Sequence, residues 1–169
     1  MIPLVVKFRD QRPESVTVRD WNKYGRIAHE LAGKHGQEVL LPRHFTPEAK
    51  GRYAHQQRTR KYLIRKIKLA SIGKAQGGGV VDNLFTGLMQ KLLQSTAGLD
   101  VYPSRVTIKM VGPRYLTFRP NRSKGSTHPD KAREIKTDTP DEARELFEIV
   151  DRSLTEQINE AKTKTEETL

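Results

Sequence analysis

The chain has 169 residues, a formal net charge of +11, 35% hydrophobic residues and no cysteine. This length favours one domain that buries about two-thirds of its unfolded surface, and the absence of cysteine excludes a disulfide framework and a thiolate metal site. The charge is uneven, because the segment from Asp138 to the end has ten acids and four bases, which leaves +17 on residues 1–137. Such asymmetry indicates either nucleic acid near the basic part or copies that pack an acidic face on a basic face.

The first elements are a strand and a long helix. Leu4, Val6 and Phe8 alternate with Val5, Lys7 and Arg9, which is the period of a half-buried strand. A helix is predicted from about Arg19, and we expect it to continue as far as the proline at position 42. Its apolar face is predicted to consist of Trp21, Tyr24, Ile27, Ala28, Leu31 and Ala32. Gly25 and Gly33 are expected to weaken this helix by up to about 1 kcal/mol each relative to alanine.

The segment from Pro42 to Gly79 is strongly basic and has one acid, Glu48. A connection this long is uncommon unless it is disordered or functional, so we interpret it as an extended arm that faces a partner or DNA, with a short helix at about 57–70. Its cations are Arg43, Lys50, Arg52, Arg58, Arg60, Lys61, Arg65, Lys66, Lys68 and Lys74. Its expected anchors are His44, Phe45, Pro47, Tyr53 and Tyr62. The closing triplet Gly77-Gly78-Gly79 is interpreted as a flexible joint.

A β-meander follows the arm. A short helix is predicted from Leu84 to Leu93. Strands are then predicted around Leu99–Val101, Val106–Met110 and Leu116–Phe118, because apolar and polar residues alternate there between turn residues. One more short strand is expected around Ile135. These patterns predict an α+β fold in which a small antiparallel sheet, made of the meander and the N-terminal strand, packs against two long helices.

The last helix has the clearest start signal. Thr139 is placed as the N-cap, Pro140 suits the first helical position, and Glu142 completes a capping box. The helix is predicted at 140–161, and its core face is expected to consist of Leu146, Phe147, Val150, Leu154 and Ile158. We therefore expect one α+β domain over residues 1–161 and a flexible tail at 162–169.

Motifs for catalysis, metals and membranes are lacking in the sequence. No histidine pair has the spacing of a zinc-hydrolase helix, and no serine lies in a nucleophile-elbow context. No apolar run approaches the roughly 20 residues that span a bilayer, and the short apolar start has no basic leader. We expect a soluble, non-enzymatic protein made inside the cell, with no catalytic, metal or cofactor residues. The basic arm leaves non-specific contact with DNA phosphates open, as it does docking on an acidic protein face.

Five motifs, in order, resemble the neck and tail-completion proteins of tailed bacteriophages. They cover residues 19 to 161. The first two are a helix that ends in His44-Phe45-Thr46-Pro47-Glu48-Ala49 and a basic stretch through Arg60-Lys61-Tyr62. The others are the helix start Phe85-Thr86-Gly87, the meander element Pro113-Arg114-Tyr115-Leu116, and the closing helix with Thr139-Pro140-Asp141-Glu142-Ala143. The glycine triplet and the tail after Ala161 depart from the pattern.

The resemblance implies a structural virion protein. Members of this family have a small sheet on long helices and form rings at the head–tail junction. The implied partners are further copies of the chain, neighbouring neck, portal-side or tail proteins, and packaged DNA, and the implied location is the neck of a virion assembled in the host cytoplasm. A ring needs head-to-tail contacts between identical subunits, and an acidic helix and a basic arm on one chain suit such contacts. The alternative is a nucleic-acid-binding accessory protein that uses residues 42–79.

Overall fold

The computed structural model describes residues 16–55, 57–74, 88–95, 97–110, 134–135 and 137–166. The predicted α+β class is confirmed, since helices accompany a two-stranded antiparallel sheet in this part of the chain. The residues fall into two compact units. We name Ile2–Gly36, Gly98–Lys109 and Pro140–Leu169 the helix–hairpin unit, and Gln37–Ala97 with Met110–Thr139 the basic unit. The single domain over 1–161 stays a prediction.

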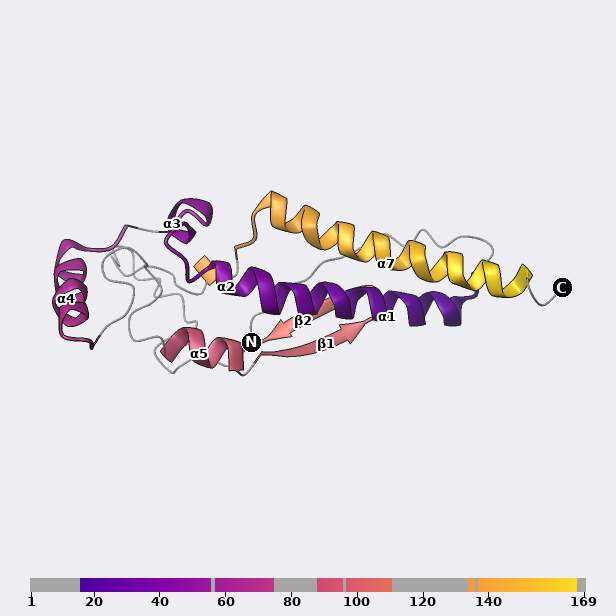
Figure 1. Ribbon diagram of the computed structural model, residues 1–169, viewed down its shortest axis with the longest axis horizontal. Helices are drawn as coiled ribbons and strands as arrows, with labels where there is room; N and C mark the ends of the chain where they lie inside the picture. The colour runs from indigo at the N-terminus through magenta and orange to yellow at the C-terminus, as the bar shows by residue number, and fades with distance from the viewer. Residues whose placement is uncertain are drawn as a thin grey trace, which may run out of the picture. The chain divides into compact units, whose positions relative to one another are not determined.

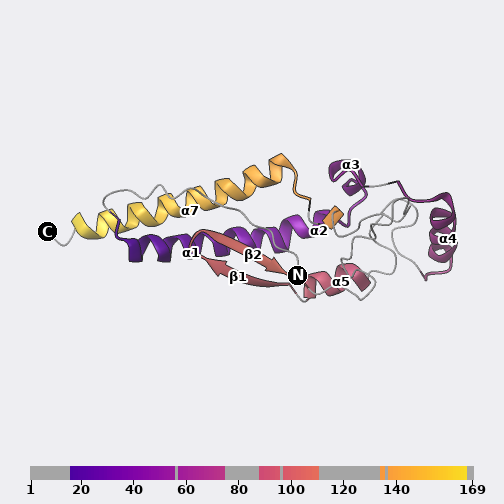
Figure 2. The ribbon, with the colours of Figure 1, turned by 180° about the vertical axis from the view of Figure 1, so that it is seen from behind.

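The helix–hairpin unit is built on an antiparallel pair of long helices, α1 (Val18–His35) and α7 (Pro140–Glu166), which lie side by side in Figures 1 and 2. Two polar contacts fix their register. His35 Nε2 lies 2.7 Å from Glu145 Oε1 near one end, and Gln157 donates to the Tyr24 carbonyl over 3.4 Å near the other. The two long helices of the prediction therefore pack on each other.

Helix α1 buries its small residues and exposes large ones. Its N-cap is Thr17, whose hydroxyl accepts a hydrogen bond from the Asp20 amide. The buried positions are Gly25, Ala28, His29, Ala32 and Gly33. Ile27 and Leu31 are 39% and 46% exposed, so their predicted place in the core is wrong. The buried face is rotated toward the small residues because a β-hairpin packs against them.

That hairpin consists of β1 (Gly98–Tyr102) and β2 (Arg105–Lys109), paired with Leu99 opposite Ile108 and Val101 opposite Val106. A Cβ on Gly25 would lie 2.2 Å from the Pro103 carbonyl oxygen in the hairpin turn. A Cβ on Gly33 would lie 2.6 Å from the Val106 side chain. The two glycines that cost helix propensity therefore allow the sheet to approach α1 closely.

Helix α7 begins at Pro140 as predicted and runs to Glu166, five residues beyond the predicted end at Ala161. The longer helix fits the sequence, since no glycine or proline follows Ala161 and lysine and glutamate favour a helix. Leu146 and Val150 are buried as expected, whereas Leu154 and Ile158 are only half-buried.

Phe147 does not belong to the core face of α7, because its side chain is 52% exposed. The inward positions are Glu142, Leu146, Val150 and Ser153, which recur every three or four residues along one narrow stripe. Phe147 follows Leu146 and is turned about 100° from it around the helix axis. A single stripe facing one neighbouring helix therefore does not include it.

We expect the stability of the helix–hairpin unit to fall as the pH drops below 6.5. His29 is buried against the hairpin side of α1, and its Nδ1 donates to the Gly25 carbonyl over 2.6 Å. Burial lowers the pKa of His29 from its ordinary value of 6.5, although the bond to Gly25 partly opposes this. The unfolded chain therefore binds a proton at a higher pH than the folded chain does, and stability present above pH 6.5 is lost below it.

Urea unfolding followed by Trp21 fluorescence at several pH values measures this effect. In a His29→Gln variant the drop in stability between neutral and mildly acidic pH is expected to be smaller than in the parent chain. An equal drop in both proteins would assign the acid sensitivity to other groups.

The basic unit continues the chain from α1 through a π-helical turn, Gly36–Leu40, into α2 (Leu41–Arg43). The predicted continuation of the first helix through residues 39–41 is thereby confirmed. Pro42 has no N–H, and its ring would collide with the carbonyl four residues earlier in a regular α-helix. The wider π-helical turn ends at Leu40, two residues before this proline, and such a turn inserts one extra residue into the helix.

The described part of the predicted basic arm folds into short helices joined by turns and loops, so it is not one extended segment, and the short helix expected at about 57–70 is confirmed. It contains α3 (Ala49–Arg52) and α4 (Arg60–Ser71), and α5 (Leu88–Ser95) follows it in the chain. Buried apolar residues of this unit include Leu40, Leu41, Phe45, Ala49, Leu93 and Ile135. Ile135 is helical, so the strand predicted there is wrong. The N-terminal strand, the strand at Leu116–Phe118 and the joint at Gly77–Gly79 lie outside the described residues.

Candidate partner-binding surface

The turn after α2 is closed by its own backbone. The amides of His44, Phe45 and Thr46 each donate to the carbonyl three residues earlier, over 3.0–3.3 Å. The Thr46 hydroxyl donates to the Arg43 carbonyl over 3.0 Å. A hydrogen bond from its own backbone amide lowers the pKa of the exposed Glu48 carboxyl, and one with Thr46 acts in the same direction. These local bonds give the His-Phe-Thr-Pro-Glu motif a fixed shape.

Three of the five predicted anchors are buried behind this turn. His44, Phe45 and Tyr53 are buried, Tyr62 is half-buried, and Pro47 is exposed. The His44 and Tyr53 rings stack with centroids 3.7 Å apart and planes 14° from parallel, and His55 lies at 6.1 Å beyond Tyr53. These rings form part of the core of the basic unit.

His55 reaches the stack through a strained backbone. Ala54 has φ +47°, which costs an L-residue other than glycine about 1–2 kcal/mol. In return, the His55 amide donates to the Lys50 carbonyl over 3.1 Å and closes the end of α3.

Arg58 is buried in an ion pair. Its Nη1 lies 2.9 Å from Glu134 Oε1 and its Nη2 lies 2.6 Å from Glu134 Oε2, and both side chains are almost fully buried. This planar, two-point geometry is the strongest form of an Arg–carboxylate pair. Arg58 was predicted to face a partner or DNA. That prediction is wrong in this structure, because the 134–135 segment covers Arg58 and the guanidinium compensates a buried acid.

Helix α4 is a well-bounded element. Thr59 caps its N-terminus by accepting from the Tyr62 amide over 3.3 Å. At its other end Gly73 has φ +69°, Gly73 donates to the Ala70 carbonyl, and Lys74 donates to the Leu69 carbonyl over 2.8 Å. This pair of bonds is a Schellman motif, which requires the left-handed conformation that glycine adopts at no steric cost. The helix therefore ends where the sequence supplies Gly73.

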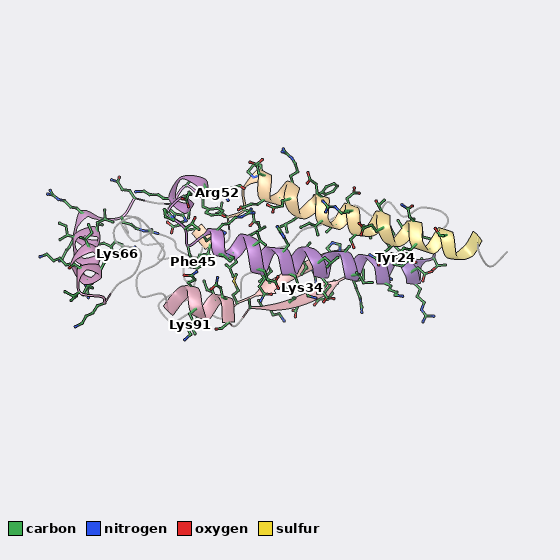
Figure 3. The ribbon with its side chains drawn as sticks, viewed as in Figure 1. Tyr24, Lys34, Phe45, Arg52, Lys66 and Lys91 are labelled. Atoms are coloured by element: carbon green, nitrogen blue, oxygen red, sulfur yellow. The ribbon has the colours of Figure 1, made fainter. Side chains whose placement is uncertain are left out.

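In α4 a lysine is buried and isoleucines are exposed, which is the reverse of the pattern in a helix that packs in a protein core. Its one fully buried side chain is Lys66 (Figure 3), whereas Ile64 and Ile67 are 45% and 54% exposed. Lys66, like Arg58, was predicted to face outward, and its burial contradicts that. Arg60, Ile64, Ile67, Lys68 and Ser71 are all exposed and recur at three- and four-residue steps. We name these five residues the isoleucine strip.

The other predicted cations of the arm remain accessible. Arg43 is half-buried, and the exposed ones are Lys50, Arg52, Arg60, Lys61, Arg65, Lys68 and Lys74. Helix α4 has no acidic residue between Arg60 and Ser71. An exposed helix with several cations and no acid is suited to an acidic partner, whether protein or phosphate.

One edge of the α1–α7 pair carries acidic and apolar side chains, whereas α4 carries cations and apolar side chains. Because the helices are antiparallel and His35 contacts Glu145, one turn further along the pair Leu31 of α1 and Ile149 of α7 lie at the same level. Ile27 lies one further turn away on α1. Ile27 and Leu31 are exposed and Ile149 is half-buried, with Glu145, Glu148 and Glu156 on the same side of α7. We name these six residues the acidic edge.

The isoleucine strip and the acidic edge were not predicted. The strip could have been found from the sequence, because Ile64 and Ile67 are spaced to share a helix face with Arg60 and Lys68. The edge could not, since it depends on how α1 is rotated against the hairpin.

The described helices include none that is long and apolar enough to cross a membrane. Among the described residues, histidines and carboxylates do not gather in a group of three or more that could hold a metal ion. Comparison with protein families, curated proteins and solved structures found no match.

Proposed function

We propose that this protein is a structural component of the neck of a tailed bacteriophage, where it assembles as a homo-oligomeric ring that joins head and tail. The order of five sequence motifs along residues 19–161 supports this proposal. The protein works by binding to further copies and to neighbouring neck, portal-side or tail proteins, and it performs no catalysis.

The observation that carries the proposal is the presence of two different exposed surfaces of complementary character on one chain. The isoleucine strip is cationic and apolar, and the acidic edge is anionic and apolar. Contacts between two unlike surfaces of identical subunits are head-to-tail, and they close into a ring when the rotation between subunits permits. In this proposal α4 acts as a preformed helix, which replaces the extended arm expected from the sequence.

Light scattering on the purified full chain tests the proposal. We expect a discrete mass that corresponds to a closed ring, or a mass that grows when neck partners are added, in the absence of DNA. A chain that stays monomeric under both conditions would contradict the neck role.

A second candidate is non-specific binding of nucleic acid. It is favoured by the seven exposed cations of the 42–74 segment. Binding to phosphates releases counterions, so its affinity falls linearly with salt on a log–log plot. A monomer that gains mass only with duplex DNA, and loses it steeply with salt, would support this candidate over the ring.

A further inference from the structure

The isoleucine strip has the features of a docking helix. It combines two isoleucines that are about half exposed with flanking cations, and α4 is fixed at both ends by its own caps. Within the described part of the chain, no helix or strand makes an extensive contact with α4. A preformed helix with an apolar stripe binds a complementary groove without a large cost of ordering.

The acidic edge offers the matching chemistry. The seam between α1 and α7 presents the apolar side chains of Ile27, Leu31 and Ile149, and the carboxylates of Glu145, Glu148 and Glu156 border them on α7. One cation, Arg152, lies on the same side of α7, so the acids outnumber it. Glu145 is already held by His35, which leaves Glu148 and Glu156 as exposed carboxylates that can meet incoming cations.

We infer that α4 of one copy docks on the acidic edge of a second copy, with Ile64 and Ile67 against Leu31 and Ile149 and with Arg60 and Lys68 near Glu148 and Glu156. This inference rests on the proposed ring assembly and names its contact. Apolar burial supplies the affinity in such an interface, and the charged rim selects the partner and its orientation. The contact is head-to-tail, so every subunit uses both surfaces.

Charge reversal tests the contact in the full chain. The strip variant is Arg60→Glu with Lys68→Glu, and the edge variant is Glu148→Lys with Glu156→Lys. Each alone places like charges opposite one another, and we expect its self-association to weaken about tenfold or more. An equimolar mixture of the two variants restores opposite charges at every contact where the two variants alternate. Association close to that of the parent chain is therefore expected, measured by light scattering and sedimentation.

A matched control uses two exposed cations of the same segment that lie off the strip, Arg65→Glu with Lys74→Glu. This control changes the net charge equally, should leave self-association within about threefold of the parent, and should not rescue the edge variant. Rescue only when all four reversals share one chain would overturn docking between copies.

The outcomes also separate this inference from the proposed function. A parent chain that forms rings while both reversal variants assemble normally would leave the neck role standing and overturn the named contact. Parent chains that stay monomeric both alone and with neck partners would overturn both. A strip variant that loses duplex DNA binding but keeps self-association would assign the strip to nucleic acid and overturn the docking.

Discussion

Replacement of Arg58 by methionine is expected to lower the free energy of unfolding of the basic unit by about 3–5 kcal/mol. The change removes the partner of a carboxylate that is almost fully buried, with bonds of 2.6 and 2.9 Å lost at once. Leaving a buried charge without a partner lowers the free energy of unfolding far more than losing an ion pair at the surface does. Hydrogen exchange of the backbone amides between residues 40 and 60 measures the loss, since it reports on this unit separately from the rest of the chain.

Two variants show whether the loss comes from the buried charge. Arg58→Met combined with Glu134→Leu replaces the pair by apolar groups of similar volume, and it should recover most of the lost stability. Arg60→Met removes an exposed guanidinium two residues away and should change stability by less than about 0.5 kcal/mol. If Arg58→Met behaved like Arg60→Met, the ion pair would be irrelevant to stability.

Local signals in the sequence were sufficient for the ends of several elements. The Thr139-Pro140 pair marks the start of α7, because proline is tolerated at a first helical position and threonine at an N-cap is suited to accept a hydrogen bond from a backbone amide of the first turn. Apolar and polar residues alternate around Leu99 and Val106, and this period of two predicts the two strands of the hairpin. Each of these signals acts over a few residues, so neighbouring sequence is enough to read it.

The orientation of elements depended on distant residues and was missed. Periodicity ranks positions by apolar character, which placed Ile27 and Leu31 in the core of α1. The hairpin instead requires the smallest side chains at the contact, so Gly25 and Gly33 face it. Phe147 was misplaced for a related reason, since one narrow stripe of α7 is buried and a residue one step away from it is not.

For the candidate partner-binding surface too, the sequence predicts local charge but not tertiary contacts. A dense run of cations correctly marks a surface rich in positive charge, because most of its lysines and arginines are exposed. The run does not show which cations are buried. Arg58 meets a glutamate 76 residues further along the chain, and Lys66 occupies the buried side of α4. Both facts depend on tertiary packing, which charge patterning alone does not encode.

Substitution of Gly25 by alanine is expected to destabilise the helix–hairpin unit by about 1–3 kcal/mol. Alanine has the higher helix propensity by about 1 kcal/mol, so propensity alone predicts the opposite sign. The new methyl group would lie 2.2 Å from the Pro103 carbonyl oxygen and 3.1 Å from its carbonyl carbon. These are backbone atoms, which cannot turn away as a side chain can, so the hairpin turn has to move off α1. Thermal unfolding followed by far-UV circular dichroism, with Trp21 fluorescence as a local probe, measures the loss.

The same glycine-to-alanine substitution at two other helical positions separates the effect of steric contact from the effect of helix propensity. At Gly33 the new methyl meets the Val106 side chain at 2.6 Å and the Leu99 side chain at 3.1 Å, and side-chain atoms shift more readily than the backbone does, so a smaller loss than at Gly25 is expected. At Gly51 in α3 nothing lies within 4 Å, so only propensity acts and a gain of about 0.5–1 kcal/mol is expected. If Gly25→Ala stabilised the protein as Gly51→Ala does, the hairpin would not lie against α1 at this point. The order Gly25, Gly33, Gly51, from loss to gain, would instead show that close approach of the hairpin is what keeps glycine in α1.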